Sequence, residues 1–509
     1  MLGLLRGNPE AVSLFKFNSF STPNSIGHWL MAGLLTFLDP FIVTKLMVTM
    51  MFVGFVAALT FLRVRTAPGQ GGVKSTMLIG TALSFNWLWL VGFYNFIIGA
   101  IFLLVATAVC RTWISTMNFR RCICMLLLLL ITYFSHIVSL VVLIGCITAI
   151  AILTRGPKMI YNCSYLALAM LPIAPLLASY NASANRRGTF TPVWRSVDDL
   201  LSLRGWIKQI RTADSFILIS RNNFPFVEHK AAVFALFTPL IWIFIAFLLF
   251  GVATLKSQVR VSSIRDSPKF PFLVLFVVLS VGALFAPDDF GTENGGVLRE
   301  RILLFGLALF TPIFHSGPSR QNRLSQIVLV FVIGFQTTAL WEYALKSDRD
   351  ATEFFSVRSA ILPNDALASV SLIESQARFS SVTEAQRDGY LDFRQKTTIL
   401  DNYELGYELF PVVLKEPRDR NLTRDLASSN LIRTNTQDNR FRKELEEFSE
   451  ALSRHHQRIG TLIMWGRNPD VEAVVQEWFD SRPYFERGRV RLFRHKGLGS
   501  TTGSSSKSQ

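Results

Sequence analysis

Residues 41–65, F-I-V-T-K-L-M-V-T-M-M-F-V-G-F-V-A-A-L-T-F-L-R-V-R, decide the fold class of this chain. Residues 41–62 contain a single charged side chain, Lys45, and Arg63 and Arg65 follow at once. A helix of about 20 apolar residues crosses the hydrocarbon core of a bilayer, and a lysine within it can extend its ammonium group toward the surface. We therefore predict a membrane-spanning helix over 41–62 whose arginine end faces the cytoplasm.

Similar apolar stretches recur along the chain and predict about ten transmembrane helices. The ten segments are 41–62, 76–90, 93–110, 122–134, 137–154, 160–180, 231–255, 270–286, 302–315 and 326–341. Segments 76–90 and 122–134 are shorter than a full span. A re-entrant pair, tilted half-helices and halves of longer spans are therefore alternatives to full crossings at these two places.

The loops between these segments alternate in charge. Loops 63–74, 111–121, 155–158, 256–269 and 320–323 together hold 14 Lys and Arg residues and one acidic residue, Asp266. The opposite loops, at 91–92, 135–136 and 288–300, have no such basic excess. Basic residues are enriched in cytoplasmic loops, so the first set is predicted to be cytoplasmic and both chain termini are predicted to be exported.

Composition supports a membrane protein. The chain has 509 residues, of which 50% are hydrophobic and 17% are charged, and its mean hydropathy is +0.34. Such values are unusual for a water-soluble globule. The isoelectric point near 9.9 comes largely from basic residues in short loops beside apolar segments, so we predict membrane lipid as a partner and no nucleic acid.

The predicted domain organisation has four parts. Residues 1–40 form an exported N-terminal segment, 41–343 an all-α polytopic membrane domain with an exported loop at 181–230, 344–497 a small exported α/β domain, and 498–509 a disordered tail. Within the loop, the spacing of apolar residues over 197–210 predicts interfacial helices. Within the α/β domain we predict strands at 366–370, 461–465 and 489–493 and helices at 443–459 and 471–479.

Several chemical motifs are absent from the sequence or have simpler explanations. All five cysteines lie in or beside apolar segments, so no disulfide framework is predicted. Cys122 and Cys124 form a C-x-C pair, for which packing by small side chains is a better explanation than metal binding. No metal site is predicted, although a divalent metal is not excluded. The sequence contains no Walker-type loop, H-E-x-x-H motif or convincing Ser-His-Asp set, which disfavours ATP-driven transport and proteolysis.

Six stretches carry a resemblance to a known group of proteins. They are 17–28 (F-N-S-F-S-T-P-N-S-I-G-H), 86–95 (N-W-L-W-L-V-G-F-Y-N), 133–136 (Y-F-S-H), the acidic loop ending in Arg299-Glu300-Arg301, 400–412 (L-D-N-Y-E-L-G-Y-E-L-F-P-V) and 461–466 (T-L-I-M-W-G). In this order they resemble bacterial GT-C-type membrane glycosyltransferases, the broad class of dolichyl-phosphate mannosyltransferases and of aminoarabinose and Rgt-like lipopolysaccharide transferases. The resemblance covers most of the chain, and it implies a GT-C-like architecture in the bacterial inner membrane.

The resemblance implies transfer of a sugar from a polyprenyl-phosphate donor to a cell-envelope acceptor on the exported face. Such chemistry needs a carboxylate as general base and cations that stabilise the departing lipid phosphate. The family places its acidic residue in the first exported loop, after a first span. This sequence lacks that span, and its N-terminal segment has only Glu10 and Asp39. We expect either insertion with the N-terminus outward or an upstream segment beyond this sequence, and either an active enzyme or a degenerate relative.

The candidate site residues are the polar groups on the predicted exported side. The catalytic candidates are His136, Asp288, Asp289 and Glu293; the candidates for binding lipid phosphate or donor are Arg186, Arg187, Arg299 and Arg301. Each has a structural alternative: His136 as a helix-end cap, the Arg-Glu-Arg run as an ion-pair partner of Asp288 or Asp289, and Arg186 and Arg187 as interfacial anchors. Asn86 and Asn95 are expected to hydrogen-bond between helices.

Two other classes of function remain open at this stage. A multi-span transporter or flippase also has many spans and charged residues facing outward, but transporters place polar sites near the bilayer midplane. Here the charged residues concentrate at the outer edges of apolar segments. A non-catalytic membrane protein whose exported domain binds a partner is the third possibility.

Overall fold

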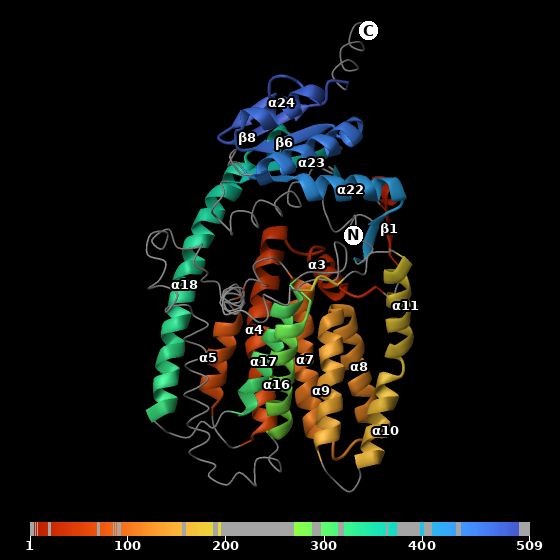
Figure 1. Cartoon of the computed structure of the whole chain (residues 1–509), viewed down its shortest axis with the longest axis vertical. Coiled ribbons are helices and arrows are strands. Elements are labelled where there is room, and N and C mark those ends of the chain that lie inside the picture. Colours follow the sequence, from red (N-terminus) through yellow and green to blue (C-terminus); the bar gives the residue numbers. More distant parts are fainter. Residues whose placement is uncertain are drawn as a thin grey trace. The chain divides into compact units, whose positions relative to one another are not determined.

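The computed structural model describes part of the chain and divides it into two compact units (Figure 1). The helical unit is Ser19–Ala339, and the sheet unit combines Met1–Asn18 with Leu340–Gln509. The described residues are Leu5, Gly7, 9–18, 22–68, 72–84, Asn86, Leu88, 93–154, 159–186, 192–194, 269–287, 297–313, 320–362, 365–373, 398–401, 410–433 and 439–497. The predicted segment 231–255, the interfacial helices over 197–210 and the tail 498–509 lie outside them.

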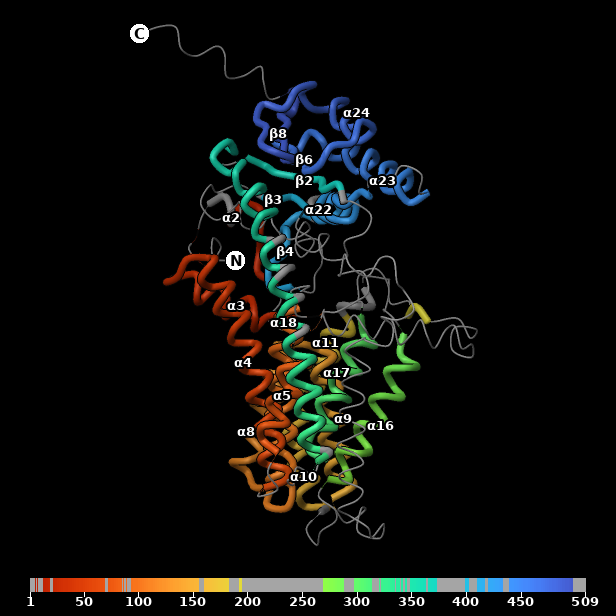
Figure 2. Tube along the Cα trace, turned by 90° about the vertical axis from the view of Figure 1, so that its left-hand side faces the viewer, coloured from red at the N-terminus to blue at the C-terminus, as the bar shows by residue number. Residues whose placement is uncertain are grey.

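The described part of the helical unit consists of helices. They are α3 (Ile26–Leu34), α4 (Pro40–Thr66), α5 (Val73–Ser84), α7 (Tyr94–Trp113), α8 (Phe119–Ser135), α9 (Ile137–Leu153), α10 (Met159–Met170), α11 (Ile173–Arg186), α16 (Phe270–Phe285), α17 (Leu298–Phe310), the 3₁₀ turn η4 (Thr311–Ile313) and α18 (Arg320–Phe355). Figure 2 shows α18 as one continuous helix, and its later residues belong to the sheet unit.

The predicted fold class is confirmed in its coarse form, a mostly helical chain with a small sheet region, but not in its number of spans. Among the described residues, α4 and α7 are long and apolar enough to cross a membrane, and α10 with α11, bent by 43°, would make a third. The prediction of about ten is not met, because several apolar runs form helices too short for a full crossing. Helix α5 has 12 residues and α17 has 13.

Local sequence signals set the ends of the longest predicted span. Asp39 is the N-cap of α4, and its Oδ1 accepts a hydrogen bond from the backbone N–H of Phe41 at 3.0 Å. Pro40 occupies the first helical position, where its missing N–H costs nothing. Arg63 and Arg65 lie in the last turn, where cations interact favourably with the helix dipole.

Helix α7 lies at the centre of the helical unit and packs against α4, α8 and α9. Its side chains Leu103 and Leu104 are fully buried. Gly99 allows a close approach to α9, because a Cβ atom there would lie 2.6 Å from the Ser139 Oγ and 3.0 Å from the His136 Cβ. Small residues permit such backbone contacts between helices, so the start of α9 is held firmly against α7.

Two basic residues of the predicted cytoplasmic loops are buried instead of solvated. Arg63 is 1% exposed and donates from Nη1 to the carbonyl of Pro312 at 2.7 Å. Lys269 is 5% exposed, and its Nζ lies 3.4 Å from the carbonyl of Ile313. Both acceptors belong to η4, which continues α17, so the two cations bind the carbonyl-rich end of that helix.

The described residues of the sheet unit form eight strands and several helices. The strands are β1 (Phe15–Phe17), β2 (Ala366–Ile373), β3 (Thr398–Ile399), β4 (Val412–Leu414), β5 (Leu431–Arg433), β6 (Thr461–Trp465), β7 (Phe485–Arg487) and β8 (Val490–Arg494). The helices are α2 (Pro9–Leu14), α22 (Pro417–Ser429), α23 (Asn439–His455) and α24 (Pro469–Trp478), with 3₁₀ turns η5 (Arg358–Ala360) and η7 (His456–Arg458). The three predicted strands and two predicted helices of this region are confirmed, within a few residues at their ends.

The main sheet is mixed, with strand order β3-β2-β6-β8-β7. Strands β3, β5 and β6 pair with β2 in parallel, whereas β8 is antiparallel to β6 and to β7. Because β6 occupies one side of β2, the short strands β3 and β5 share the other side. The gap between them is bridged by Asp401, whose Oδ2 accepts from the Ser369 N–H at 2.9 Å and from the Ser369 hydroxyl at 2.6 Å.

The N-terminal strand β1 belongs to the sheet unit. It pairs antiparallel with β4, with Lys16 opposite Val413, and Asn18 donates to the carbonyl of Phe410 at 3.0 Å. Residues 1–18 therefore pack with the C-terminal part of the chain, whereas α3 belongs to the helical unit. The prediction of one segment over 1–40 misses this division, because a three-residue strand has no recognisable periodicity.

Candidate functional site

Three of the eight predicted site residues can be placed with their side chains. His136 lies between α8 and α9, and Arg299 and Arg301 lie in the first turns of α17. Arg186 is the last residue of α11. Arg187, Asp288, Asp289 and Glu293 lie outside the described residues. The structure brings His136 and Arg301 together.

The contact between His136 and Arg301 is buried and polar. Arg301 Nη1 lies 3.2 Å from His136 Nε2, and the two residues are 5% and 6% exposed. A guanidinium group has donors and no acceptor, so the imidazole must accept through its Nε2 lone pair. His136 is therefore neutral with its proton on Nδ1, and Nδ1 has no hydrogen-bond partner among the described residues.

Aromatic rings surround this contact. The Arg301 guanidinium carbon lies 4.4 Å from the ring centre of Phe93 and 5.4 Å from that of Phe96, and the Phe96 ring packs edge-on against His136 at 5.2 Å. Cation–π attraction is strongest where water is excluded. We call Phe93, Phe96, His136 and Arg301 the arginine–histidine cluster; α7, α17 and the α8–α9 junction supply it.

Arg299 has a different set of contacts from Arg301. Its Nε donates to the carbonyl of Ala283 at 2.9 Å, in the last turn of α16, and the side chain is 7% exposed. This contact fits a cation at a helix C-terminus. However, both arginines also lie at the N-terminal end of α17, where the helix dipole disfavours cations. The start of α17 therefore holds two buried guanidinium groups and one carboxylate, Glu300, and its net positive charge suits an anion.

The backbone immediately before α17 is strained. Val297, its N-cap residue, has a φ of +64° and adopts the left-handed conformation. A β-branched residue pays of order 1–3 kcal/mol for this conformation. Such strain persists where the surrounding structure imposes it, and it occurs frequently at functional sites. Here it sets the path of the chain into the helix that carries Arg299 and Arg301.

The residues just before α3, together with its first turn, hold this end of the helical unit together. The N–H of Ser25 donates to the carbonyl of Phe134 at 2.7 Å, close to His136. Asn95, in the first turn of α7, accepts from the N–H of Gly27 at 2.7 Å and donates to the carbonyl of Asn24 at 2.8 Å. Four of the stretches singled out in the sequence, those ending at His28, Asn95, His136 and Arg301, therefore converge at one place.

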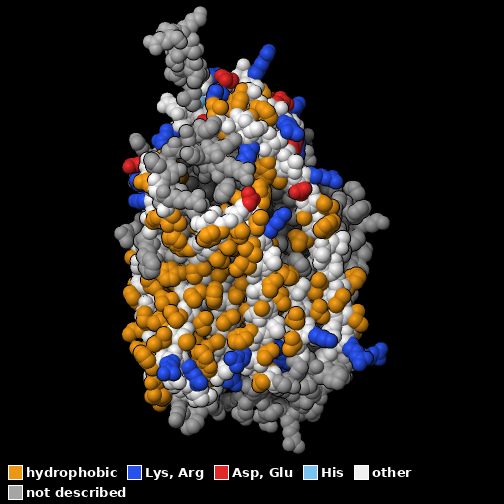
Figure 3. Space-filling view, turned by 180° about the vertical axis from the view of Figure 1, so that it is seen from behind, with side chains coloured by type: hydrophobic (Ala, Val, Ile, Leu, Met, Phe, Trp, Pro, Cys, Tyr) orange, Lys and Arg blue, Asp and Glu red, His pale blue; other side chains and the backbone are white. Residues whose placement is uncertain are grey.

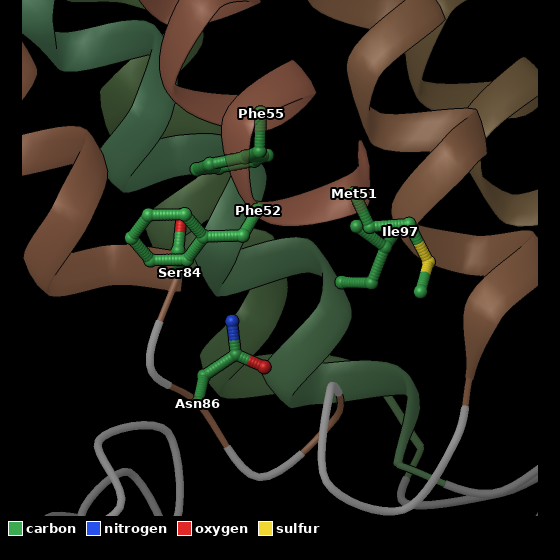
Figure 4. Close-up of a pocket in the computed structure, with 6 residues that line it drawn as sticks. All are labelled: Met51, Phe52, Phe55, Ser84, Asn86 and Ile97. Atoms are coloured by element: carbon green, nitrogen blue, oxygen red, sulfur yellow. The ribbon is translucent and has the colours of Figure 1, made fainter. Parts of the chain in front are cut away.

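A small cavity lies between α4, α5 and α7 and is lined by Met51, Phe52, Phe55, Ser84, Asn86 and Ile97 (Figure 4). Its walls are mostly apolar. Ser84 donates to the carbonyl of Gly80, and Asn86 donates to the carbonyl of Leu83, so both polar groups bind the C-terminal end of α5. None of the predicted site residues lines this cavity, and its lining resembles a packing gap more than a catalytic pocket.

Comparisons with protein-family models, with curated proteins and with solved structures found no match for this chain. Within the described ranges, no group of three or more His, Cys, Asp or Glu residues is arranged to hold a metal ion. The arguments for function therefore rest on the residues themselves.

Two features of the site were not anticipated from sequence. Phe93 and Phe96 contact Arg301, yet in sequence they read as two apolar positions in an apolar segment. Asn95 was expected to bond between helices, and it does so by accepting from the Gly27 N–H of α3; its bond to the carbonyl of Asn24, just before α3, was not anticipated. The spacing of Phe93 and Phe96, three residues apart and hence on one helix face, was the available signal. The sequence alone does not show that this helix face contacts Arg301.

Proposed function

We propose that this chain is an integral membrane glycosyltransferase, which moves a sugar from a polyprenyl-phosphate donor to a cell-envelope acceptor on the exported face of a bacterial inner membrane. The observation that carries the proposal is the buried arginine–histidine cluster at the start of α17. The cluster supplies the guanidinium group of Arg301, and Arg299 lies two residues earlier in the same helix turn; guanidinium groups at a helix N-terminus are suited to bind a phosphate. The GT-C-like architecture and the additional spans expected from the sequence belong to this proposal.

The surface of the helical unit supports a membrane location. Large apolar side chains are exposed along α4, α9, α16 and α18, among them Val53, Val141, Val278 and Phe331 at 56%, 58%, 59% and 67%. Figure 3 shows hydrophobic side chains covering one face of this unit, with Lys and Arg gathered along its edge. A soluble monomer rarely exposes apolar patches of this extent, and an edge of basic residues is typical of a cytoplasmic membrane boundary.

The pairing of β1 with β4 supports termini on a single side of the membrane. Strand β1 precedes every helix of the helical unit, and β4 follows all of them. Two strands that share hydrogen bonds lie on the same side of a bilayer. The number of crossings between them is then even, which agrees with the ten expected from the sequence and with exported termini.

The cluster suits the proposed reaction. The acceptor hydroxyl would attack the anomeric carbon, a general base would take its proton, and the bond from that carbon to the phosphate oxygen would break, leaving its electron pair on the lipid phosphate. Arg301 and Arg299 would stabilise that charge, and the Nδ1–H of His136 is a further donor. With its Nε2 lone pair bound to Arg301, His136 is poorly suited as the base, and the role is proposed for Asp288, Asp289 or Glu293.

The proposal can be tested by measuring sugar transfer from a panel of polyprenyl-phosphate sugars with the full chain in lipid nanodiscs. We expect Arg301→Ala to lower turnover by about 100-fold or more, and Asp288→Asn to lower it if that residue is the base. Arg65→Ala is the matched control. Arg65 lies in the last turn of α4, outside the arginine–histidine cluster, and this variant should retain activity. Turnover unaffected by Arg301→Ala and Arg299→Ala, or carrier movement across the bilayer without sugar transfer, would contradict the proposal.

A further inference from the structure

Residues 22–28, which lead into α3 and form its first turn, are hydrogen-bonded to α7 at Asn95 and to α8 at Phe134, each next to a residue of the arginine–histidine cluster. We propose that Asn95 is a positioning residue for the reaction proposed above, and that it fixes Arg301 by clamping the first turn of α7 to this turn. The inference rests on the proposed function and adds a residue to it. The hydrogen-bond partners of the Asn95 side chain are Asn24, Gly27 and His28. Asn95 therefore acts on Arg301 through its neighbours Phe93 and Phe96.

The amide of Asn95 is used at both of its polar atoms. Oδ1 accepts from the Gly27 N–H at 2.7 Å, which fixes the orientation of the amide group. Nδ2 donates to the carbonyl of Asn24 at 2.8 Å and lies 3.1 Å from Nδ1 of His28. The approach is close: a Cβ atom at Gly27 would lie 2.5 Å from Asn95 Oδ1. This side chain and this glycine are therefore a point of close approach between the first turn of α3 and α7.

The clamp determines where the partners of Arg301 lie. Phe93 and Phe96 flank Asn95 in sequence, and their rings lie against the guanidinium group. The same turn is bonded to α8 through Ser25 and the carbonyl of Phe134, next to His136. A movement of the turn would displace the aromatic and the imidazole contacts of Arg301 together. Misplacement by about 1 Å of a group that stabilises a transition state can cost about 100-fold in rate.

The decisive variant is Asn95→Asp, which keeps the shape of the side chain. One carboxylate oxygen still accepts from Gly27, but the other now faces the carbonyl oxygen of Asn24. The two oxygens repel each other when the carboxyl group is ionised. On acidification the protonated carboxyl group can donate to Asn24, and a protonated His28, whose Nδ1 lies 3.1 Å from both the Asn95 Nδ2 position and the Asn24 carbonyl, can donate to the carboxylate; either restores the clamp. Partial burial favours the protonated form. The effect of this variant should therefore depend on pH.

We expect the turnover of Asn95→Asp, divided by that of the wild type at the same pH, to be about 30- to 100-fold low at about pH 8. The ratio should recover by up to about tenfold for each pH unit of acidification, until the carboxyl group is protonated. Asn95→Leu should be equally slow at every pH. Asn118→Asp, at the opposite end of α8, is the matched control, because aspartate caps a helix as well as asparagine does. The turnover of Asn118→Asp, divided by that of the wild type, should not change with pH.

Two further measurements separate this inference from the proposed function. Hydrogen exchange at the Gly27 amide measures whether its hydrogen bond to Asn95 is intact. Binding of a polyprenyl phosphate without sugar measures whether the arginine–histidine cluster still holds a phosphate. Wild-type turnover by Asn95→Asp at all pH values, or a loss without pH dependence at an unchanged Gly27 exchange rate, would overturn the role of Asn95. If the wild type transfers no sugar, the proposed function fails, and the role of Asn95 then depends on whether Asn95→Asp weakens polyprenyl phosphate binding with the same pH dependence.

Discussion

The Nη1 atom of Arg301 lies 3.2 Å from the Nε2 atom of His136, which is 165 residues earlier in the chain. Because an arginine can only donate, this contact assigns the imidazole proton to Nδ1. His136 and Arg301 therefore form a donor pair with one positive charge. The pair is suited to hold an anion and unsuited to accept a proton from an acceptor hydroxyl.

The first prediction concerns the hydrogen-bond acceptor that the His136 Nε2 atom offers to Arg301. Glutamine places its Oε1 at about the reach of the imidazole Nε2, and it also keeps an N–H donor. We expect His136→Gln to reduce sugar transfer by less than about fivefold. His136→Leu, which removes the acceptor and the donor, should reduce it by about 100-fold. The measurement is turnover of each variant in nanodiscs, at matched amounts of folded protein.

The reverse order of these two variants would contradict the assigned role. If His136 were a general base, His136→Gln and His136→Leu would lose activity equally, since neither side chain can take a proton near neutral pH. Equal losses would therefore return His136 to the list of candidate bases and remove the donor-pair interpretation.

The second prediction concerns the gap in the sheet between β3 and β5. Asp401 is 6% exposed and supplies the acceptor that the Ser369 N–H would otherwise lack. We expect Asp401→Ala to destabilise the sheet unit by about 2–4 kcal/mol, because a buried backbone donor is left without its acceptor. Burial raises the pKa of Asp401, so the neutral Asp401→Asn should cost less, about 1 kcal/mol.

Hydrogen exchange at the amides of 368–372, measured on the full chain, tests this prediction. Ser369→Ala is the control, because it removes the hydroxyl bond to Asp401 and leaves the backbone bond intact. It should increase exchange less than Asp401→Ala does. Equal effects would indicate that the hydroxyl, and not the bridging of the gap, is the important contact.

The third prediction concerns the end of α18, which Arg489 attaches to the β7–β8 hairpin. The Arg489 guanidinium lies 2.7 Å from both Asp350 and Glu353. Burial alone would raise the pKa of Glu353, but the hydrogen bonds and charge of Arg489 bring it below its usual value. A carboxylate with a lowered pKa stabilises the fold above its unfolded pKa, near 4.3, and this stabilisation is lost as the pH falls through the folded value.

Glu353→Gln should therefore destabilise the sheet unit at neutral pH by no more than about 1 kcal/mol, since Arg489 is half exposed and solvent screens the pair. The difference from the wild type should decrease as the pH falls below about 4 and vanish once the pH is below the folded pKa of Glu353. Thermal unfolding of the full chain at several pH values is the measurement. Glu447→Gln, in the exposed pair with Lys443, is the control and should change little. A Glu353→Gln effect that persists at acid pH would contradict the ionic explanation.

The sequence predicted elements whose signals are local. Strand β6 is an apolar run between two glycines, Gly460 and Gly466, and α24 begins with an asparagine N-cap and a proline at its first position. These signals act over a few residues, so a single sequence reveals them.

The contacts that make the site are not local, and the sequence could not reveal them. Nothing near His136 indicates that its partner is Arg301, and nothing near Phe15 indicates a partner strand at 412–414. The apolar segments also misplaced some helix ends: α17 ends at Phe310, where the turn η4 begins inside the apolar run 302–315, whereas α4 and α18 extend beyond their apolar segments. Tertiary packing decides these cases.

The last prediction uses a pair of histidines in the sheet unit. The Gly497 N–H donates to Nδ1 of His495 at 3.1 Å, so the proton of that neutral ring is on Nε2, which lies 2.9 Å from Nδ1 of His456. His456 also stacks on Trp478, at 4.0 Å between ring centres. Both imidazole lone pairs are thus occupied by N–H groups, and protonation of either ring must break a hydrogen bond.

Burial lowers the pKa of both rings; the neighbouring His495 lowers the pKa of His456 further, whereas Asp480 partly offsets the effect on His495. A histidine with a lowered pKa stabilises the folded state above its unfolded pKa, near 6.5. That stabilisation decreases as the pH falls from this value toward the folded pKa, because the unfolded chain then binds more protons. The sheet unit should therefore lose about 1 kcal/mol of stability between about pH 6.5 and 5.

The double variant His456→Phe/His495→Phe should remove this pH dependence, because neither ring can then be protonated, although its stability at neutral pH will be lower. Lys496→Ala is the control: it removes bonds to the carbonyls of Gln476 and Glu477 and should lower stability while keeping the loss on acidification. The measurement is unfolding of the full chain across this pH range, followed by hydrogen exchange at the amides of β8. It distinguishes the double histidine variant from the Lys496→Ala control. An unchanged acid loss in the double variant would show that other groups cause it.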